Sequence, residues 1–241
     1  MKYAVVIPAR YQSGRFPGKP LIDLLGKPMI QHVWELCCKA VGSEHVYIAT
    51  DSELIKNKAE YFGAKVIMTS DTCMTGTDRL AEANKTLDCD FIINVQGDEP
   101  LIKPADINTL IQAYLATPHT VINAMCAIKD EAEFRSFNVP KVVTSKSGRL
   151  LYMSRSPIPI TKSNDYHFGY KQVCIYVFSK VHLEFFSLHT EKTPTEQVED
   201  IEILRFLEND IPVQMIEVKT SSAAVDVPAD VAKVITLLSV K

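Results

Sequence analysis

The sequence predicts an α/β fold, with a mainly parallel sheet flanked by helices and a small antiparallel sub-domain. Two observations predict this fold. Short apolar runs alternate with stretches of helical periodicity over the first 130 residues, as right-handed strand–helix–strand units require. The 241 residues are 46% hydrophobic and 23% charged, which suits one large globular domain and excludes a disordered or fibrous chain.

The elements of the first half can be placed in order. Five short β-rich runs are the expected strands of the parallel sheet: residues 3–8, 46–50, 65–68, 91–95 and 121–128. Apolar residues recur at helical spacing from Ile30 to Cys38, and Asp51-Ser52 has the composition of a helix start. Two further helices are predicted over 77–85 and 104–115, the latter with proline in its first turn.

The pattern changes from residue 131. Residues 141–144 and 150–153 predict a hairpin around Ser147-Gly148, and a longer strand follows at 172–179. We expect residues 131–180 to form a lid or dimerisation sub-domain inside a single domain spanning 1–241. A helix over 196–209, with Val198, Ile201, Leu204 and Leu207 on one face, precedes a strand at 213–218 and a last helix at 228–240.

The loop after the first predicted strand is rich in cations. Ligands of open α/β sheets bind at the carboxyl ends of the strands, and backbone N–H groups with fixed cations suit an anion. The loop has neither the Walker A pattern nor the dinucleotide fingerprint. We therefore favour a nucleotide or sugar-phosphate site over an ordinary basic surface loop. Its cations are Arg10, Arg15 and Lys19, and its shape is constrained by Gly14, Pro17, Gly18 and Pro20.

Acidic residues follow the predicted strand at 91–95. Asp98 and Glu99 come directly after that strand, where they could hold Mg²⁺ at a phosphate; an acidic turn before a helix is the alternative. Asp226 precedes the last predicted helix and is either its cap or a second metal ligand facing Asp98. Asp88-Cys89-Asp90 has a metal-binding D-x-D form but precedes its strand, at the wrong end of the sheet.

Charge and cysteine usage limit the partners and the compartment. Twenty-six basic against 29 acidic residues give a net charge of −3, which argues for neither nucleic acid nor a membrane surface. No apolar run approaches the ~18 residues of a membrane span, and no export cleavage site follows the first strand. The six cysteines contain no C-x-x-C pair, so we expect reduced thiols in a cytoplasmic protein.

These motifs together resemble a known family, the sugar-acid cytidylyltransferases. The run from Ala9-Arg10 to Lys19-Pro20-Leu21 is similar to their nucleotide-binding signature. The remaining motifs follow the order of the 3-deoxy-manno-octulosonate (Kdo) cytidylyltransferases nearly end to end. They are Gly26-Lys27-Pro28-Met29-Ile30, Ala49-Thr50-Asp51, Thr75-Gly76-Thr77-Asp78-Arg79-Leu80-Ala81-Glu82, Asn94-Val95-Gln96-Gly97-Asp98-Glu99-Pro100, Lys141-Val142-Val143, Tyr152-Met153-Ser154-Arg155, and Val225-Asp226 followed by Pro228.

The resemblance implies a fold of nucleotide-diphospho-sugar transferase type, CTP as donor, Mg²⁺, and a homodimer formed through the sub-domain. It implies transfer of CMP to a Kdo-type sugar acid for lipopolysaccharide biosynthesis. Its catalytic residues would be Arg10, Arg15, Lys19 and Asp98, with Mg²⁺ on Asp98 and Asp226. Ala9, Arg10, Ser13, Lys19, Thr75 and Arg79 would bind the nucleotide, and Gln96, Arg155, Gln172, Tyr176 and Glu199 the sugar.

The sequence departs from the family pattern on the sugar side. Gln172 stands where members usually have histidine and Ile203 where they have glutamine, whereas the nucleotide loop is intact. This suggests a modified acceptor, such as a Kdo whose terminal hydroxyl is an amine (8-amino-3,8-dideoxy-octulosonate), or neutral drift in an ordinary Kdo enzyme. A cytidylyltransferase for sialic-acid-type nonulosonic acids and a non-catalytic CTP sensor remain the alternatives.

Overall fold

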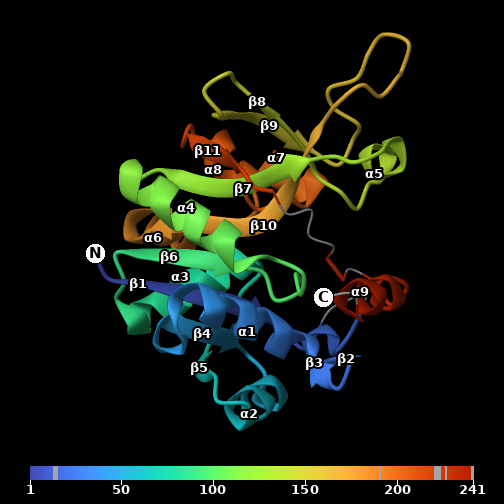
Figure 1. The fold of residues 1–241 in the computed structure, drawn as a ribbon. Helices are drawn as coiled ribbons and strands as arrows, with labels where there is room; N and C mark the ends of the chain where they lie inside the picture. Colours follow the sequence, from blue (N-terminus) through green and yellow to red (C-terminus); the bar gives the residue numbers. More distant parts are fainter. Residues whose placement is uncertain (13–15, 190, 220–223, 226, 240–241) are drawn as a thin grey trace.

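The fold is built around one large mixed sheet (Figure 1). The computed structural model describes residues 1–241 except 13–15, 190, 220–223, 226 and 240–241. Seven strands of the sheet follow the order β11-β7-β10-β6-β1-β4-β5. Their bounds are β1 Tyr3–Ala9, β4 Val46–Thr50, β5 Lys65–Met68, β6 Phe91–Val95, β7 Val121–Ala127, β10 Tyr170–Ser179 and β11 Val213–Glu217.

Most neighbouring strands run parallel, which confirms the predicted fold class. β1 pairs in parallel with β4 and β6, and the β4–β5 and β7–β11 pairs are also parallel. β10 is the exception, because it runs antiparallel between β6 and β7. Only Tyr170 and Lys171 at its start pair with β8 (Lys141–Thr144), which forms the predicted hairpin with β9 (Leu150–Ser154). Most of β10 therefore lies in the main sheet rather than in the small antiparallel part.

Helices cover both faces of the sheet (Figure 1). Side chains of α1, α2 and α4 pack in one core cluster, and those of α3, α6 and α8 in the other. None of the helices that the structure describes is long and apolar enough to cross a membrane. The helices are α1 Met29–Val41, α2 Glu53–Tyr61, α3 Gly76–Leu87, α4 Pro104–Ala116, α5 Glu131–Arg135, α6 Lys180–Leu188, α7 Pro194–Glu199, α8 Leu204–Glu208 and α9 Asp230–Ser239.

Burial on both faces explains why the central strands are continuously apolar. In β1, Val5 and Ile7 pack in the cluster of α1 and α4, while Ala4 and Val6 pack in the cluster of α3 and α6. A strand covered on both faces needs apolar side chains at successive positions. Each fully buried aliphatic side chain contributes about 1.5–3 kcal/mol through the surface it removes from water.

The predicted single helix over 196–209 is wrong. α7 ends at Glu199, Asp200 adopts the left-handed conformation with φ 50°, and α8 begins only at Leu204. Val198, expected on the apolar face, is 84% exposed. The break has a tertiary cause: the Glu202 carboxylate accepts hydrogen bonds from the first turn of α3, a contact that a continuous helix would redirect.

Candidate active site

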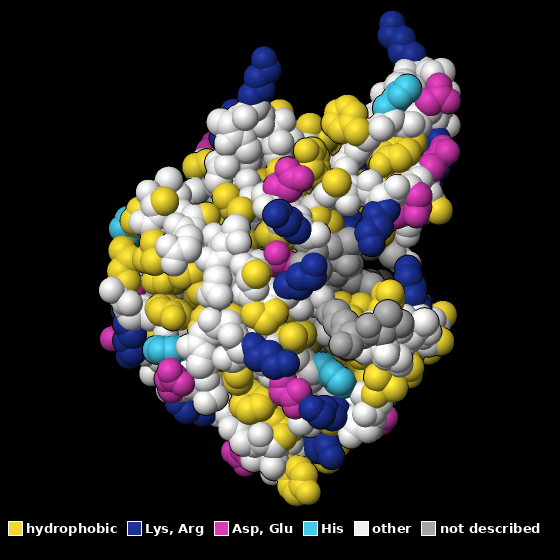
Figure 2. Space-filling view, viewed as in Figure 1, with side chains coloured by type: hydrophobic (Ala, Val, Ile, Leu, Met, Phe, Trp, Pro, Cys, Tyr) yellow, Lys and Arg dark blue, Asp and Glu magenta, His cyan; other side chains and the backbone are white. Residues whose placement is uncertain are grey.

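Two adjoining clefts open at the carboxyl ends of the parallel strands. The first cleft, about 400 Å³, is lined by the end of β1, the start of α3 and the turn after β6. The second cleft, about 740 Å³, continues toward α5 and α9. Figure 2 shows the molecule hollowed on this side, with basic and acidic side chains gathered around the hollow. Both clefts share Gln96, Asp98, Arg155, Asp200 and Glu202.

Lys19 and Asp98 meet in the first cleft. Lys19 begins a short 3₁₀ turn, Lys19–Leu21, and Asp98 lies in the turn after β6. Because β1 and β6 are parallel neighbours, their carboxyl ends bring the two following loops together. Lys19 Nζ lies 2.6 Å from Asp98 Oδ2, and the side chains are only 17% and 26% exposed. A cation and a carboxylate are thus held in contact at a site open to a ligand.

Gly97 holds the turn of Asp98 against the end of β1. A Cβ atom at Gly97 would lie 3.1 Å from the Pro8 carbonyl oxygen and 3.0 Å from Ile30 Cδ1, so a larger residue would displace the turn. The Val225 amide donates to the Asp98 carbonyl at 3.0 Å, which brings the segment before α9 beside Asp98. Three predicted site residues, Ser13, Arg15 and Asp226, lie outside the described residues.

The other predicted nucleotide residues also line the first cleft, and Arg10 lies there with Ala9 at the end of β1. Thr75 caps α3 in a capping box with Asp78. Arg79 is buried, and its guanidinium pairs with Asp51 at 3.0 Å and donates to Thr69. Arg79 therefore fixes the floor of the cleft with its charge already compensated.

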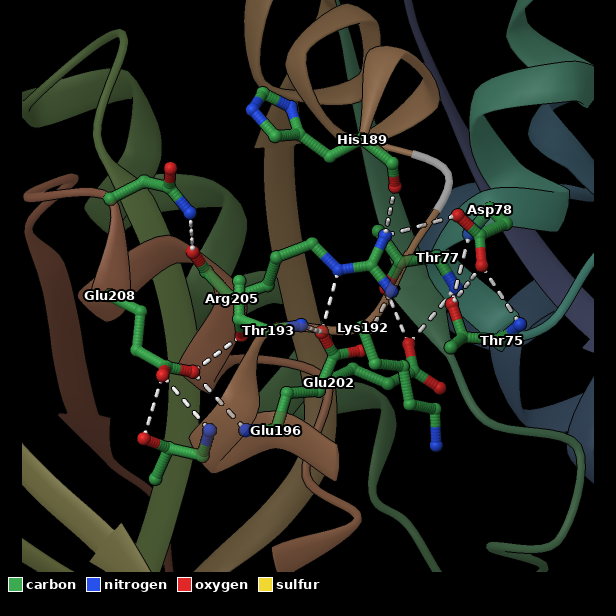
Figure 3. Close-up of polar contacts among 12 residues, drawn as sticks. Thr75, Thr77, Asp78, His189, Lys192, Thr193, Glu196, Glu202, Arg205 and Glu208 are labelled. Carbon is green, nitrogen blue, oxygen red and sulfur yellow. Dashed lines mark hydrogen bonds and ion pairs between the residues drawn. The ribbon is translucent and has the colours of Figure 1, made fainter. Parts of the chain in front are cut away.

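A polar cluster ties α7 and α8 to the first turn of α3 (Figure 3). The Glu202 carboxylate accepts from the Gly76 and Thr77 amides, each at 3.0 Å, and from the Thr77 hydroxyl at 2.6 Å. Burial raises the pKa of Glu202, although these hydrogen bonds oppose the shift. Since Glu202 also lines both clefts, it joins the cleft wall to the start of α3.

Arg205 joins the same cluster through a buried ion pair. It is fully buried and forms two bonds of 2.7 Å with the equally buried Glu196. Its guanidinium also lies 3.4 Å from Asp78 and stacks over Phe186, with its central carbon 3.7 Å from the ring centroid. The capping box of Thr75 is thereby connected to a buried ion pair (Figure 3).

The predicted sugar residues fall into two groups. Gln96, Arg155, Gln172 and Tyr176 line the second cleft. Tyr176 is almost completely buried, and burial raises its pKa well above the usual value. Arg155 donates to the carbonyls of Phe137 and Asp200, each at 3.0 Å.

Glu199 is not brought to either cleft. Its carboxylate accepts from the Ser154 hydroxyl at 2.5 Å and the Arg155 amide at 2.9 Å. It thus holds the end of β9 and orients Arg155 rather than facing the hollow.

Several residues that shape the clefts are not predicted by any sequence pattern. Lys192 lines the first cleft and forms a 2.7 Å ion pair with Asp200. Lys141 is fully buried, and its ammonium donates to the carbonyls of Ser136, Val139 and Arg155. Burial lowers the pKa of Lys141 to about 8. In the sequence Lys141 stands out only as part of a motif, because a lysine in a strand gives no sign of binding carbonyls.

Comparison with known proteins identifies the family. A sequence model of the cytidylyltransferases matches residues 4–217. The chain is 43% identical to a 3-deoxy-manno-octulosonate cytidylyltransferase of Geobacter metallireducens, over 99% of this chain and 98% of that protein. It is 40% identical to one from Escherichia coli, over 99% and 96%.

Solved structures agree with the sequence comparisons. A CMP:2-keto-3-deoxy-manno-octonic acid synthetase complexed with CTP superposes with a TM-score of 0.91 at 39% identity, covering 99% of both chains. A putative glucose-1-phosphate thymidylyltransferase from Bacillus anthracis, with 15% identity and a TM-score of 0.68, shares the fold alone. The chain is therefore a nucleotidyltransferase of the cytidylyltransferase family and belongs to its 3-deoxy-manno-octulosonate cytidylyltransferase group.

Proposed function

We propose that the protein transfers CMP from CTP to the anomeric hydroxyl of a Kdo-type sugar acid. The hydroxyl oxygen forms a bond to the α-phosphorus, the bond from that phosphorus to the bridging oxygen breaks, and pyrophosphate leaves. The hydroxyl proton is released during the attack. The Lys19–Asp98 contact carries the proposal, because it lies in the cleft with Arg10, and Asp98 reaches the adjoining second cleft.

The first cleft would bind CTP. Ala9 and Arg10 at the end of β1, Lys19, and Ser13 and Arg15 of the intervening loop would hold its phosphates. Transfer of the CMP group depends mainly on positioning the reactants and on neutralising the charge of the phosphoryl oxygens. Thr75 and Arg79 would hold the nucleotide end, Thr75 at the start of α3 and Arg79 by fixing the cleft floor through Asp51.

The acidic residues fit a magnesium ion bound together with the nucleotide. Asp98 Oδ2 accepts from Lys19, and no described residue donates to its other carboxylate oxygen. Within the described ranges no three side chains of metal-ligating type gather. The ion would thus be held by Asp98, Asp226, phosphate oxygens and water, the ligand mixture that Mg²⁺ prefers. When bound, it would neutralise phosphate charge and lower the pKa of the attacking hydroxyl.

The second cleft would bind the sugar acid. Gln96, Arg155, Gln172 and Tyr176 face it, and Glu199 would act by orienting Arg155. The charges of its lining are nearly balanced, because Asp98 and Asp200 are paired with Lys19 and Lys192 and the five other carboxylates accompany four cations. The acidic members are Asp98, Glu99, Asp130, Glu133, Asp200, Glu202 and Asp230; the basic ones are Lys129, Arg155, Lys171 and Lys233.

Competition between sugars for the purified protein tests the acceptor. With CTP and Mg²⁺, Kdo, 8-amino-3,8-dideoxy-octulosonate and a sialic-acid-type nonulosonic acid are offered together, and the CMP-sugars are quantified. We expect CMP-octulosonate products, and the ratio of kcat/KM values for Kdo and its amino form identifies the acceptor. A clear preference for Kdo would exclude a specialised amino-sugar enzyme, and a preference for the nonulosonic acid would refute both octulosonates. Removal of divalent metal by EDTA should abolish turnover, and added Mg²⁺ should restore it.

Residues 131–180 would serve as a lid and dimerisation sub-domain. The β8–β9 hairpin and the loop before β10 project from the main sheet (Figure 1). Large apolar side chains are exposed there, among them Phe137 (68%), Leu151 (50%) and Phe168 (62%), as expected of an interaction surface. Sedimentation equilibrium should give a homodimer, and Leu151→Lys with Phe168→Lys should weaken it; a monomer in the unmodified protein would refute the proposal.

The six cysteines fit a reducing compartment. All six are free thiols, and Cys37, Cys89 and Cys126 are buried. The cytoplasm would keep these thiols reduced. We place the reaction with CTP, as a step of lipopolysaccharide biosynthesis, in this compartment. We expect the isolated protein to retain full activity in millimolar reductant, and loss of activity on reduction would contradict this assignment.

A further inference from the structure

We propose that Asn123 is a positioning residue that fixes which end of the Gln172 side-chain amide faces the second cleft. Asn123 lies in β7, is fully buried, and lines neither cleft. The inference rests on the proposed function, because it concerns how the acceptor is recognised.

Asn123 compensates an irregularity in β10. Val173 lies opposite Ala124, but the next paired residue, Tyr176, lies opposite Asn123. Cys174 and Ile175 therefore form a bulge with no partner residue on β7, and such a bulge disrupts the backbone ladder. The Asn123 Nδ2 group donates to the carbonyls of Val173 and Ile175, each at 3.0 Å. Its two hydrogens thus take the place of the missing backbone donors.

The two carbonyl contacts determine the orientation of the Asn123 amide. Only the NH₂ end can donate to two carbonyls, so the Oδ1 end must point the other way. Gln172 Nε2 lies 2.9 Å from Asn123 Oδ1. Gln172 must therefore donate to Asn123 with its own NH₂ end. No described residue donates to Gln172 Oε1, and this carbonyl oxygen is the end of the amide left to the second cleft, which Gln172 lines.

The same bulge also supports Gln96 on the other side of β10. The Cys174 carbonyl accepts from the backbone N–H of Gln96 at 3.2 Å. Gln96 is the first residue of the turn that carries Asp98. Gln96, Gln172, Cys174 and Tyr176 all line the second cleft. The buried Asn123 amide thus sets the shape of this wall and directs the Gln172 carbonyl oxygen to the cleft. A sugar group that contacts this oxygen must donate a hydrogen bond, as a hydroxyl or an amine does.

Kinetics of Asn123→Ser, with CTP and with Kdo and its 8-amino form as acceptors, tests this role. Serine cannot donate to both carbonyls, so we expect the acceptor KM to rise about tenfold, roughly what one net hydrogen bond is worth. The KM for CTP should change less than about twofold. Asn84→Ser is the matched control, because Asn84 is also buried and forms two backbone hydrogen bonds with Cys89, at the far end of α3. It should leave both KM values within about twofold.

Gln172→Met provides a second variant that leaves the contacts between Asn123 and the bulge intact. It removes the whole Gln172 amide, the acceptor oxygen together with the Nε2 donor to Asn123 Oδ1, so it should raise the acceptor KM by a similar factor even if Asn123→Ser does not fold. An unchanged acceptor KM in folded Asn123→Ser or in Gln172→Met would overturn the proposal. Equal increases in the KM for CTP and for the acceptor would also overturn it. Wild-type protein that turns over neither sugar would instead refute the proposed function.

Discussion

Replacement of Arg205 by methionine should destabilise the protein strongly, because it leaves a buried carboxylate without its partner. Arg205 and Glu196 are both fully buried and share two bonds of 2.7 Å. Methionine fills much of the space of the arginine stem but leaves the Glu196 charge without its partner. Breaking a buried pair in this way costs about 3–5 kcal/mol, a large fraction of a typical total stability of about 5–15 kcal/mol.

Urea unfolding followed by circular dichroism measures this loss as a shift in midpoint at constant slope. The double variant Glu196→Gln with Arg205→Met removes the stranded charge and should recover about 2 kcal/mol or more. Lys56→Met is the control, because it breaks the exposed Lys56–Glu53 pair, which should be worth less than about 1 kcal/mol. A loss for Arg205→Met no larger than that of the control would refute the reasoning.

Three further predictions concern the site and the pH dependence of stability. Lys19→Ala and Asp98→Asn should each lower kcat by about a hundredfold or more, as loss of a preorganised charge does; near-wild-type pyrophosphate release would contradict the site. Gly97→Ala should lower kcat about tenfold with little loss of fold by circular dichroism, because its Cβ would press on the Pro8 carbonyl and move Asp98. Burial, with the nearby His119, lowers the pKa of His182 to about 4. As the pH falls from about 6.5 to 4, the unfolded chain therefore binds a proton at His182 that the folded protein does not bind. The free energy of unfolding decreases over that range. His182→Gln should reduce the stability lost between pH 7 and pH 5 by about 2 kcal/mol in urea titrations, and an unchanged loss would show that His182 does not titrate this way.

The local sequence pattern predicts those helices and strands whose boundaries do not depend on contacts with distant residues. β1 and β6 follow from their apolar runs, and the start of α2 follows from Ser52, whose hydroxyl accepts from the Ile55 amide. The place of β10 in the main sheet did not follow, because its pairing with β6 and β7 joins residues more than 40 positions apart in the sequence. The break between α7 and α8 depends on Glu202 contacting residues 125 and 126 positions earlier, which no local window contains.

The candidate site also contains residues that the sequence pattern predicts and residues that it does not. The sequence predicts Lys19 and Asp98 near one another because loops at the carboxyl ends of parallel strands meet, and the structure brings them into contact. The contacts of Asn123 could not be predicted, because a polar residue within an apolar strand has no motif and its partners lie in the bulge of a strand about 50 residues later. Glu199 was expected at the sugar, yet its carboxylate is taken up by Ser154 and the Arg155 amide.

Pyrophosphate release from CTP and Mg²⁺, with Kdo and its 8-amino form offered separately, tests the central claim most directly. We predict release that depends on the sugar, and the ratio of kcat/KM values identifies the preferred acceptor. Lys19→Ala measured beside the wild type shows whether the release comes from the cleft described above. Tight binding of CTP without release from either sugar would contradict the proposed cytidylyltransferase activity and favour a nucleotide sensor or a different acid acceptor.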